Sequence, residues 1–290
     1  MNMRLLVLVT AALAAIVEPA LAGTRPVEEH RALNGDARVS VSNVAGSITV
    51  EAWDKNEMAL AGQLSDEVQE LKIAGDASDL RIEVKVPKDS RHGGNTRLQI
   101  KVPAGVSLKV EAVSADIAVS GLKGQVKANS VSGDVAIDSK SHNVSADSVS
   151  GDVRINAPAT NTHAQTVSGD VHVAGVSGNV EAESVSGDIV VDAGTVSSIT
   201  AKTVSGDLHL GLALAPDASL QAQSLSGEIY VTLPAATSAA VDLQSFSGDV
   251  TSAFGRLEGA EGERRSQTLG SGKGKIALST FSGDVELKKK

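Results

Sequence analysis

The chain has 290 residues, with 26 Lys and Arg against 35 Asp and Glu, which gives a formal net charge of −9. This balance argues against nucleic-acid binding, which requires Lys and Arg clustered on one face. The absence of cysteine excludes disulfide bonds and a lipid-modified N-terminal cysteine.

The first 22 residues have the features of a secretory signal peptide. Arg4 gives a positive start, Leu5–Val17 is apolar except for Thr10, and Ala20–Ala22 offers a cleavage site with small residues. The alternative is an uncleaved membrane anchor, but a bilayer span needs about 20 apolar residues, more than this run contains. We therefore predict a signal peptide over 1–22, no transmembrane anchor, and an exported protein that is either periplasmic or extracellular, at the cell surface or released.

The region after the signal peptide divides into a lead segment, 23–38, and an irregular part, 39–107. Apolar residues alternate in Val39–Val50, and again in stretches such as Leu80–Val86 and Leu98–Val102. Alternation of this kind indicates strands with one buried face. We expect this part to form irregular coils that also cap the repeat array that follows, because an exposed parallel edge invites aggregation.

A six-residue motif, Ser-Val-Ser-Gly-Asp-Val, recurs with small variations through 108–290. Early copies are spaced 18 residues apart, and wider-spaced copies follow: Val131–Val135, Val149–Val153, Val167–Val171, Val185–Ile189, Val204–Leu208, Leu225–Ile229, Phe246–Val250 and Phe281–Val285. A fixed period near 20 residues is typical of solenoids, in which one structural unit stacks on the next.

Each repeat predicts two short strands joined at a corner. Apolar residues alternate on both sides of the motif, but Ser-Gly-Asp breaks the alternation, so the chain must turn there. We expect glycine to supply backbone freedom at the corner, and aspartate to accept a hydrogen bond from a turn amide. The predicted corner glycines are Gly133, Gly151, Gly169, Gly187, Gly206, Gly227, Gly248 and Gly283.

These patterns predict an all-β fold in one continuous domain. Its form is a single-stranded parallel β-helix, or β-solenoid, with coils of about 18 residues and an irregular N-terminal capping region. Successive coils would stack in parallel about 4.8 Å apart. A glycine-rich, charged stretch near 254–274 is expected to be a loop insertion before the last coil.

The Ser-Val-Ser-Gly-Asp-Val repeats and the opening Asn-Val-Ala-Gly-Ser-Ile-Thr-Val at 43–50 resemble the bacterial DUF4097 family of candidate adhesins. The resemblance extends from about Val39 to Leu287. It implies a parallel β-helix and a binding role, and it provides no catalytic residues to carry over.

Stacking would align the motif aspartates in a row, including Asp134, Asp152, Asp170 and Asp188. Carboxylates one strand spacing apart repel each other by about 1 kcal/mol per pair in water. Turn amides could offset this repulsion, and this is the main interpretation. Bound calcium, a hard ion with oxygen ligands, is the weaker alternative, and these four residues are its candidate ligands. No other cofactor is expected.

The sequence contains no marked catalytic group. The repeated serines cannot each be nucleophiles, and no pair of histidines has zinc-ligand spacing. Lys127, Ser145, His163 and Glu181 are expected to point outward in one row. We therefore predict a non-catalytic binding or scaffold protein, an adhesin that contacts an unidentified protein or glycan ligand at the cell envelope. A periplasmic envelope scaffold or stress-related component is one alternative, and a carbohydrate-active β-helix enzyme is the alternative from another class.

Overall fold

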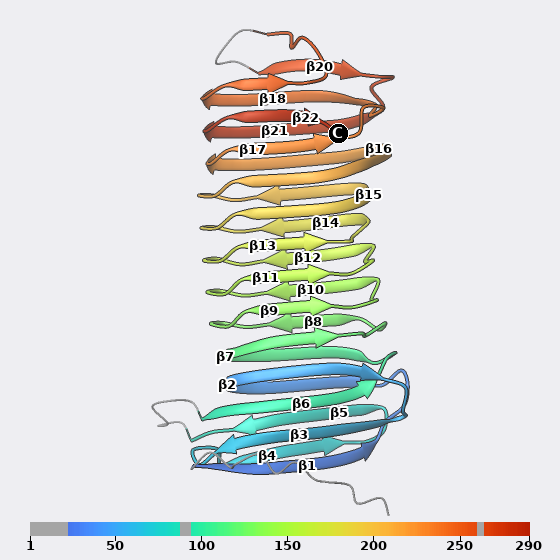
Figure 1. The fold of residues 1–290 in the computed structure, drawn as a ribbon, viewed down its shortest axis with the longest axis vertical. Coiled ribbons are helices and arrows are strands. Elements are labelled where there is room, and N and C mark those ends of the chain that lie inside the picture. Colours follow the sequence, from blue (N-terminus) through green and yellow to red (C-terminus); the bar gives the residue numbers. More distant parts are fainter. Residues whose placement is uncertain (1–22, 88–93, 260–263) are drawn as a thin grey trace, which may run out of the picture.

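The computed structural model describes residues 23–87, 94–259 and 264–290. Within these ranges the chain is an elongated rod of stacked strands with no helix (Figure 1), and the strands form one sheet with parallel and antiparallel pairings. The all-β, solenoid-like fold is therefore confirmed. None of the described residues forms a helix long and apolar enough to cross a membrane. The signal peptide predicted over 1–22 lies outside the described residues.

The N-terminal end of the rod does not follow the order of the chain. It contains β1 (Thr24–Ala32), β2 (Arg38–Trp53), β3 (Glu57–Ser65), β4 (Glu70–Gly75), β5 (Asp79–Lys85), β6 (Asn95–Pro103) and β7 (Ser107–Ser120). Strand β2 pairs in parallel with β5 and β6 on one side and with β7 on the other. Beyond it, β1 pairs with β3, β3 with β6 and β4 with β5, all antiparallel, so antiparallel strands lie at this end.

The middle of the rod is regular and contains two strands per coil. These strands are β8 (Val126–Asn129), β9 (Val135–Asp138), β10 (Asn143–Asp147), β11 (Val153–Asn156), β12 (Asn161–Gln165), β13 (Val171–Ala174), β14 (Gly178–Glu183) and β15 (Ile189–Lys202). Strands β8, β10, β12 and β14 pair in parallel and form what we call the first face. Strands β9, β11 and β13 form the second face in the same way. On both faces each residue pairs with the residue 18 positions further on.

The C-terminal end again departs from chain order. It contains β16 (Leu208–Ser226), β17 (Ile229–Leu233), β18 (Ala239–Ser247), β19 (Val250–Ser252), β20 (Arg265–Leu269), β21 (Gly274–Ser282) and β22 (Val285–Lys289). Strand β21 lies between β16 and β18, and β22 lies between β17 and β19. The last coil of the chain is thus inserted inside the rod, which corrects the expectation that coils stack in simple succession. The segment 254–274, expected as a loop, contains β20, which pairs antiparallel with β18 at this end.

The core is a narrow column of small aliphatic side chains. On the first face, Ala128, Ala146, Ala164 and Ala182 occupy equivalent inward positions and are fully buried. On the second face the inward residues are larger, such as Ile137, which is 2% exposed. Burial of one Val or Ile side chain contributes about 1.5–3 kcal/mol. Every coil repeats this contribution, so the inside of the rod holds the fold and its outward rows are available for binding.

Candidate binding surface

The corner between the two faces is the most regular feature of the rod. Ser130 at the end of the first-face strand is buried, and Gly133 is also buried. Val131 and Ser132 lie between them, and both side chains are exposed. Two successive outward residues account for the break in alternation that the sequence shows at this point. The corner therefore presents two adjacent side chains to solvent in every coil.

The buried hydroxyl before each corner holds neighbouring coils together. Thr166 Oγ1 donates a hydrogen bond of 2.9 Å to the carbonyl oxygen of Gly151, and Ser148 Oγ donates one of 3.1 Å to that of Gly133. The same kind of bond to a carbonyl of the adjacent coil is made by Ser130, Ser184, Thr203, Ser224, Ser245 and Thr280. These hydroxyl groups are structural donors.

The motif glycines lie at the corners, but the expectation that they supply backbone freedom is wrong for most of them. Of the eight, only Gly248 and Gly283 have a positive φ in the range that favours glycine, 154° and 137°. At Gly169 an added Cβ would lie 2.3 Å from the carbonyl oxygen of Gly151 in the adjacent coil. Glycine is required here because two backbones approach closely, and freedom of the backbone dihedrals is secondary.

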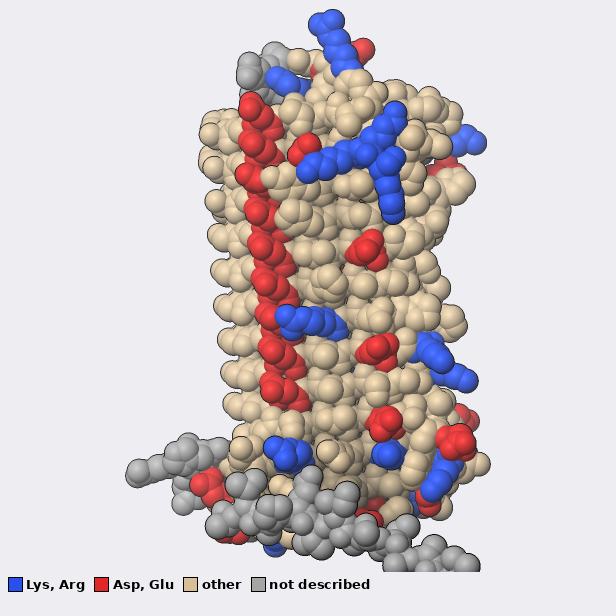
Figure 2. Space-filling model, viewed as in Figure 1, with Lys and Arg blue, Asp and Glu red and all other residues tan. Residues whose placement is uncertain are grey.

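The motif carboxylates form a continuous acidic row along the rod (Figure 2). Seven of these carboxylates accept a hydrogen bond of 2.8 to 3.1 Å from the backbone N–H of the equivalent residue in the adjacent coil: Asp116, Asp134, Asp152, Asp170, Asp188, Asp207 and, from the amide of Asp249, Asp284. The N–H of Asp170 thereby holds the pKa of Asp152 below its usual range. Turn amides therefore offset part of the repulsion.

The calcium hypothesis gains no support from this geometry. Asp134, Asp152, Asp170 and Asp188 follow one another a coil apart, and one oxygen of each carboxylate is already bonded to an amide. Among the described residues no three acidic or histidine side chains converge in a way that could hold a metal ion. A calcium ion needs six to eight oxygen ligands, which a single file of carboxylates does not bring together.

A row of exposed apolar side chains lies beside the acidic row, and the sequence patterns above did not predict it. At each corner the residue before the Ser-Gly pair of the motif, or before Ser114-Ala115 in the first copy, points to solvent, with exposures from 39% for Val167 to 67% for Phe246. We call this row the apolar ridge, and in spatial order it contains Val113, Val131, Val149, Val167, Val185, Val204, Leu225, Phe281 and Phe246. The break in alternation was the available signal, because it forces one apolar residue per coil outward.

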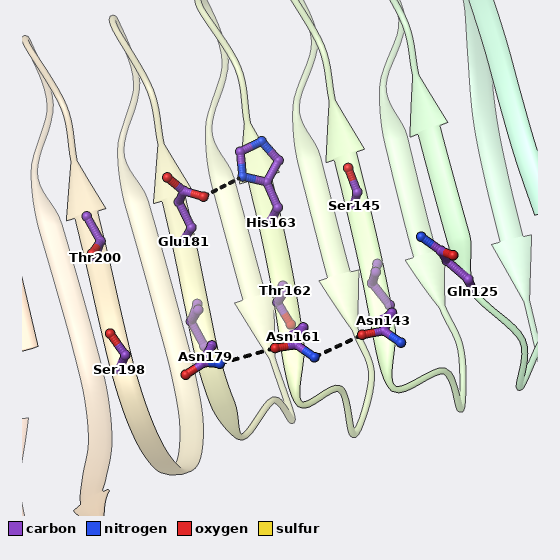
Figure 3. A pocket seen from close by; sticks show the side chains of 12 residues that line it. Gln125, Asn143, Ser145, Asn161, Thr162, His163, Asn179, Glu181, Ser198 and Thr200 are labelled. Atoms are coloured by element: carbon purple, nitrogen blue, oxygen red, sulfur yellow. Dashed lines mark hydrogen bonds and ion pairs between the residues drawn. The ribbon is translucent and has the colours of Figure 1, made fainter. Parts of the chain in front are cut away.

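A charged cluster lies in an open depression on the first face (Figure 3). The ring of His163 contacts Glu181 Oε2 through Nδ1 at 3.0 Å and Asp147 Oδ1 through Nε2 at 3.1 Å. The hydrogen bond to Asp147, supported by Glu181 and opposed by partial burial, raises the pKa of His163 to about 9. His163 is therefore a cation at neutral pH. The register confirms that Lys127, Ser145, His163 and Glu181 share one row.

An amide ladder borders the same depression. Asn161 Nδ2 donates to Asn143 Oδ1 at 2.9 Å, and Asn179 Nδ2 donates to Asn161 Oδ1 at 3.2 Å, as the dashed lines in Figure 3 show. The ladder continues towards Ser198 on the neighbouring coil. Polar groups therefore repeat at one strand spacing along this face. Such an arrangement can bind a polar partner at several equivalent points.

A known family model matches most of the chain. The family model described as Toastrack DUF4097 matches residues 38–288. A solved structure of a candidate lipid-binding protein from Parabacteroides distasonis is 11% identical, with a TM-score of 0.49, and the match covers 90% of this chain and 96% of that one. A candidate adhesin from Bacteroides fragilis is 13% identical, with a TM-score of 0.45 and coverage of 91% and 97%. Comparison with curated proteins gave no match. At these identities and TM-scores the likenesses say nothing of a ligand.

Proposed function

The chain belongs to the Toastrack DUF4097 family, and on this premise we propose that it is an exported, non-catalytic binding or scaffold protein acting at the cell envelope. Its binding surface is the outside of the solenoid, as in an adhesin. The observation that supports this proposal is the fixed register of the outward rows. One residue type recurs at one strand spacing over many coils, so a long partner meets the same group repeatedly.

The use of the polar groups supports a non-catalytic role. The repeated hydroxyls donate to backbone carbonyls, and the repeated carboxylates accept from backbone amides. His163 is held between two carboxylates with its pKa raised to about 9, so it is a poor general base at neutral pH. A nucleophile requires a neighbouring base that can take its proton, and these rows are occupied in joining coils.

The carbohydrate-active enzyme, our alternative from another class, is less well supported. Aromatic rings that bind sugars usually offer an open face. The ring of Tyr230 stacks on His209 with centroids 4.9 Å apart, and Lys288 Nζ lies 4.4 Å from the Tyr230 centroid. Neighbours therefore occupy this ring. A protein ligand and a glycan ligand both remain within the binding proposal.

Protease accessibility tests the proposed location. The tagged full-length protein is produced in cells, which are treated with protease intact, after permeabilisation of the outer membrane, and after complete lysis. Cytoplasmic and periplasmic marker proteins serve as controls. Digestion on intact cells supports the adhesin, and digestion after permeabilisation supports the periplasmic scaffold. Protection until complete lysis would contradict export and with it the proposed function.

A further inference from the structure

The apolar ridge is not explained by the packing of the rod. Val131, Val149 and Val167 lie between strands, at the corner, so strand propensity does not account for them. Their side chains are 46%, 45% and 39% exposed. The next residue in the same corner, such as Ser132, is exposed too and is polar. The corner thus tolerates polar residues, yet each coil places an apolar one at the same position. Contiguous exposed apolar surface of this kind usually marks an interaction site.

The ridge becomes larger towards the C-terminal end of the rod. Valine gives way to Leu225, then to Phe281 and Phe246, which are 54%, 53% and 67% exposed. The two phenylalanine rings stack with centroids 4.7 Å apart and an angle of 8° between their planes. A groove of about 600 Å³ runs between these side chains and the first face. Exposed aromatic side chains beside a groove are the usual anchors of a protein interface.

Charge indicates what can cover the ridge. Each ridge residue is followed three positions later by a carboxylate, so the acidic row runs along its side, as with Val131 and Asp134. An anionic lipid surface would be repelled by this row. In a dimer packed ridge to ridge with the two rods antiparallel, the two acidic rows would face and repel each other. With the two rods parallel, the acidic row of each copy would face the groove of the other, whose lining includes one cation, Lys202. A partner with cations beside its apolar residues is complementary.

Spacing indicates the form of that partner. Ridge residues repeat at about 4.8 Å, the spacing of neighbouring strands. One turn of an α-helix advances about 5.4 Å, whereas equivalent side chains on one side of an extended strand are about 6.7 Å apart. An apolar stripe on a helix therefore matches the ridge more closely than an extended segment does.

We propose that the apolar ridge is a docking surface for an amphipathic helix of a protein partner, with an apolar stripe that lies on the ridge and a Lys or Arg stripe that faces the acidic row. Phe246, Phe281 and Leu225 are its anchoring residues. The proposal rests on the binding role proposed above and assigns that role to one surface and one class of partner.

A designed peptide tests the proposal directly. The probe is a fluorescein-labelled Leu–Lys peptide with leucines at i, i+3, i+4 and i+7, and the control peptide is a scramble of the same composition and charge. Binding to the full mature chain is measured by fluorescence anisotropy. We expect saturable binding of the helical probe and at least about tenfold weaker binding of the scramble, which corresponds to about 1.4 kcal/mol. Equal binding of both peptides, or no binding, would overturn the proposal.

Variants assign the binding to the ridge. F246S/F281S should weaken binding at least about tenfold. V149S/V167S/V185S should also weaken binding, and it tests the part of the ridge that lies away from the C-terminal end of the rod. V190S is the matched control, because Val190 pairs with His172 in an outward row of the second face. D152N/D170N/D188N should weaken binding and reduce its dependence on salt. Circular dichroism checks that each variant is folded. Unchanged binding in both folded ridge variants would contradict the assignment.

The other possible occupants give separate outcomes. Flotation with phosphatidylcholine vesicles, with and without phosphatidylglycerol, tests a lipid surface, and sedimentation of the purified chain tests self-association. Vesicle binding or a dimer that is lost in F246S/F281S would replace the helix as the occupant. Peptide binding does not depend on cellular location. Failure of the peptide test would thus leave export intact, and failure of export would leave the peptide result standing.

Discussion

Asp170 Oδ1 accepts a hydrogen bond of 2.9 Å from the backbone N–H of Asp188, which lies in the next coil of the rod. This contact recurs along the acidic row, so each carboxylate that repels its neighbours also holds the neighbouring corner in place. The row is thus a structural element in which hydrogen bonding and charge repulsion oppose each other. The two contributions can be separated by substitution.

We expect Asp170→Asn to change the free energy of unfolding by less than about 0.5 kcal/mol, because the amide oxygen can accept the same bond and one repelling charge is removed. Asp170→Ala removes the acceptor and should cost about 1 kcal/mol. Urea denaturation followed by circular dichroism measures both. Equal destabilisation by the two substitutions would show that charge, and not the hydrogen bond, supports the corner.

Salt should stabilise the rod, because ions screen the repulsion within the acidic row. Calcium should raise the melting temperature no more than magnesium at the same concentration, since the four candidate aspartates are aligned in single file. Differential scanning calorimetry with each ion makes the comparison. A shift specific to calcium that disappears in D134N/D152N/D170N/D188N would restore the calcium hypothesis.

Gly169→Ala should destabilise the chain by about 1–3 kcal/mol, because the new Cβ would lie 2.3 Å from the Gly151 carbonyl oxygen and one coil must move. Gly194→Ala is the matched control. There the nearest atom to an added Cβ is the Val176 carbonyl oxygen at 3.6 Å, so we expect little change or a gain of less than about 1 kcal/mol. Similar urea midpoints for the two variants would disprove the close-approach explanation.

Thr166→Val should cost about 1–3 kcal/mol, because it keeps the shape of a side chain that is 1% exposed but removes the donor to the Gly151 carbonyl. Thr200→Val makes the same change on the outward side of the first face and should be nearly neutral. Chemical denaturation of the two variants in parallel checks this. A loss of stability in Thr166→Val no larger than that in Thr200→Val would mean that the hydrogen bond of the buried hydroxyl contributes nothing.

The His163 cluster should make stability depend on pH. The folded-state pKa of about 9 lies above the usual 6.5, so the folded chain binds more protons between these values. The contribution is complete below about pH 6.5 and is lost as the pH rises through about 9. Because the His163 side chain is 34% exposed, we expect this contribution to the free energy of unfolding to be no more than about 1 kcal/mol. The free energy of unfolding, measured from pH 6 to 9.5, should decrease in the wild type. This decrease should be smaller in His163→Gln, and in His172→Gln it should equal that of the wild type. A decrease of the same size in all three would contradict the assignment.

Much of the fold follows from local pattern. Alternation around the repeat identifies the inward residues and the corner, because in a strand side chains alternate between the two sides of the sheet. The row of Ser145, His163 and Glu181 also follows from a constant repeat length. The spatial order of the end coils does not follow. Leu220 pairs with Ile276, 56 residues away, and the exposed edge of one coil resembles that of another, so local sequence does not select among them.

The sequence by itself determined that this chain is built from stacked strands with a small aliphatic interior, because periodic burial is encoded residue by residue. Only the tertiary structure decided the order of the end coils, the role of the corner glycines and the direction of the apolar ridge. All three depend on the angle at the corner and on the distance between neighbouring backbones. Exposure of Val131 and the approach of a Cβ at Gly169 to the Gly151 carbonyl are properties of adjacent coils in space, and no single repeat contains that information.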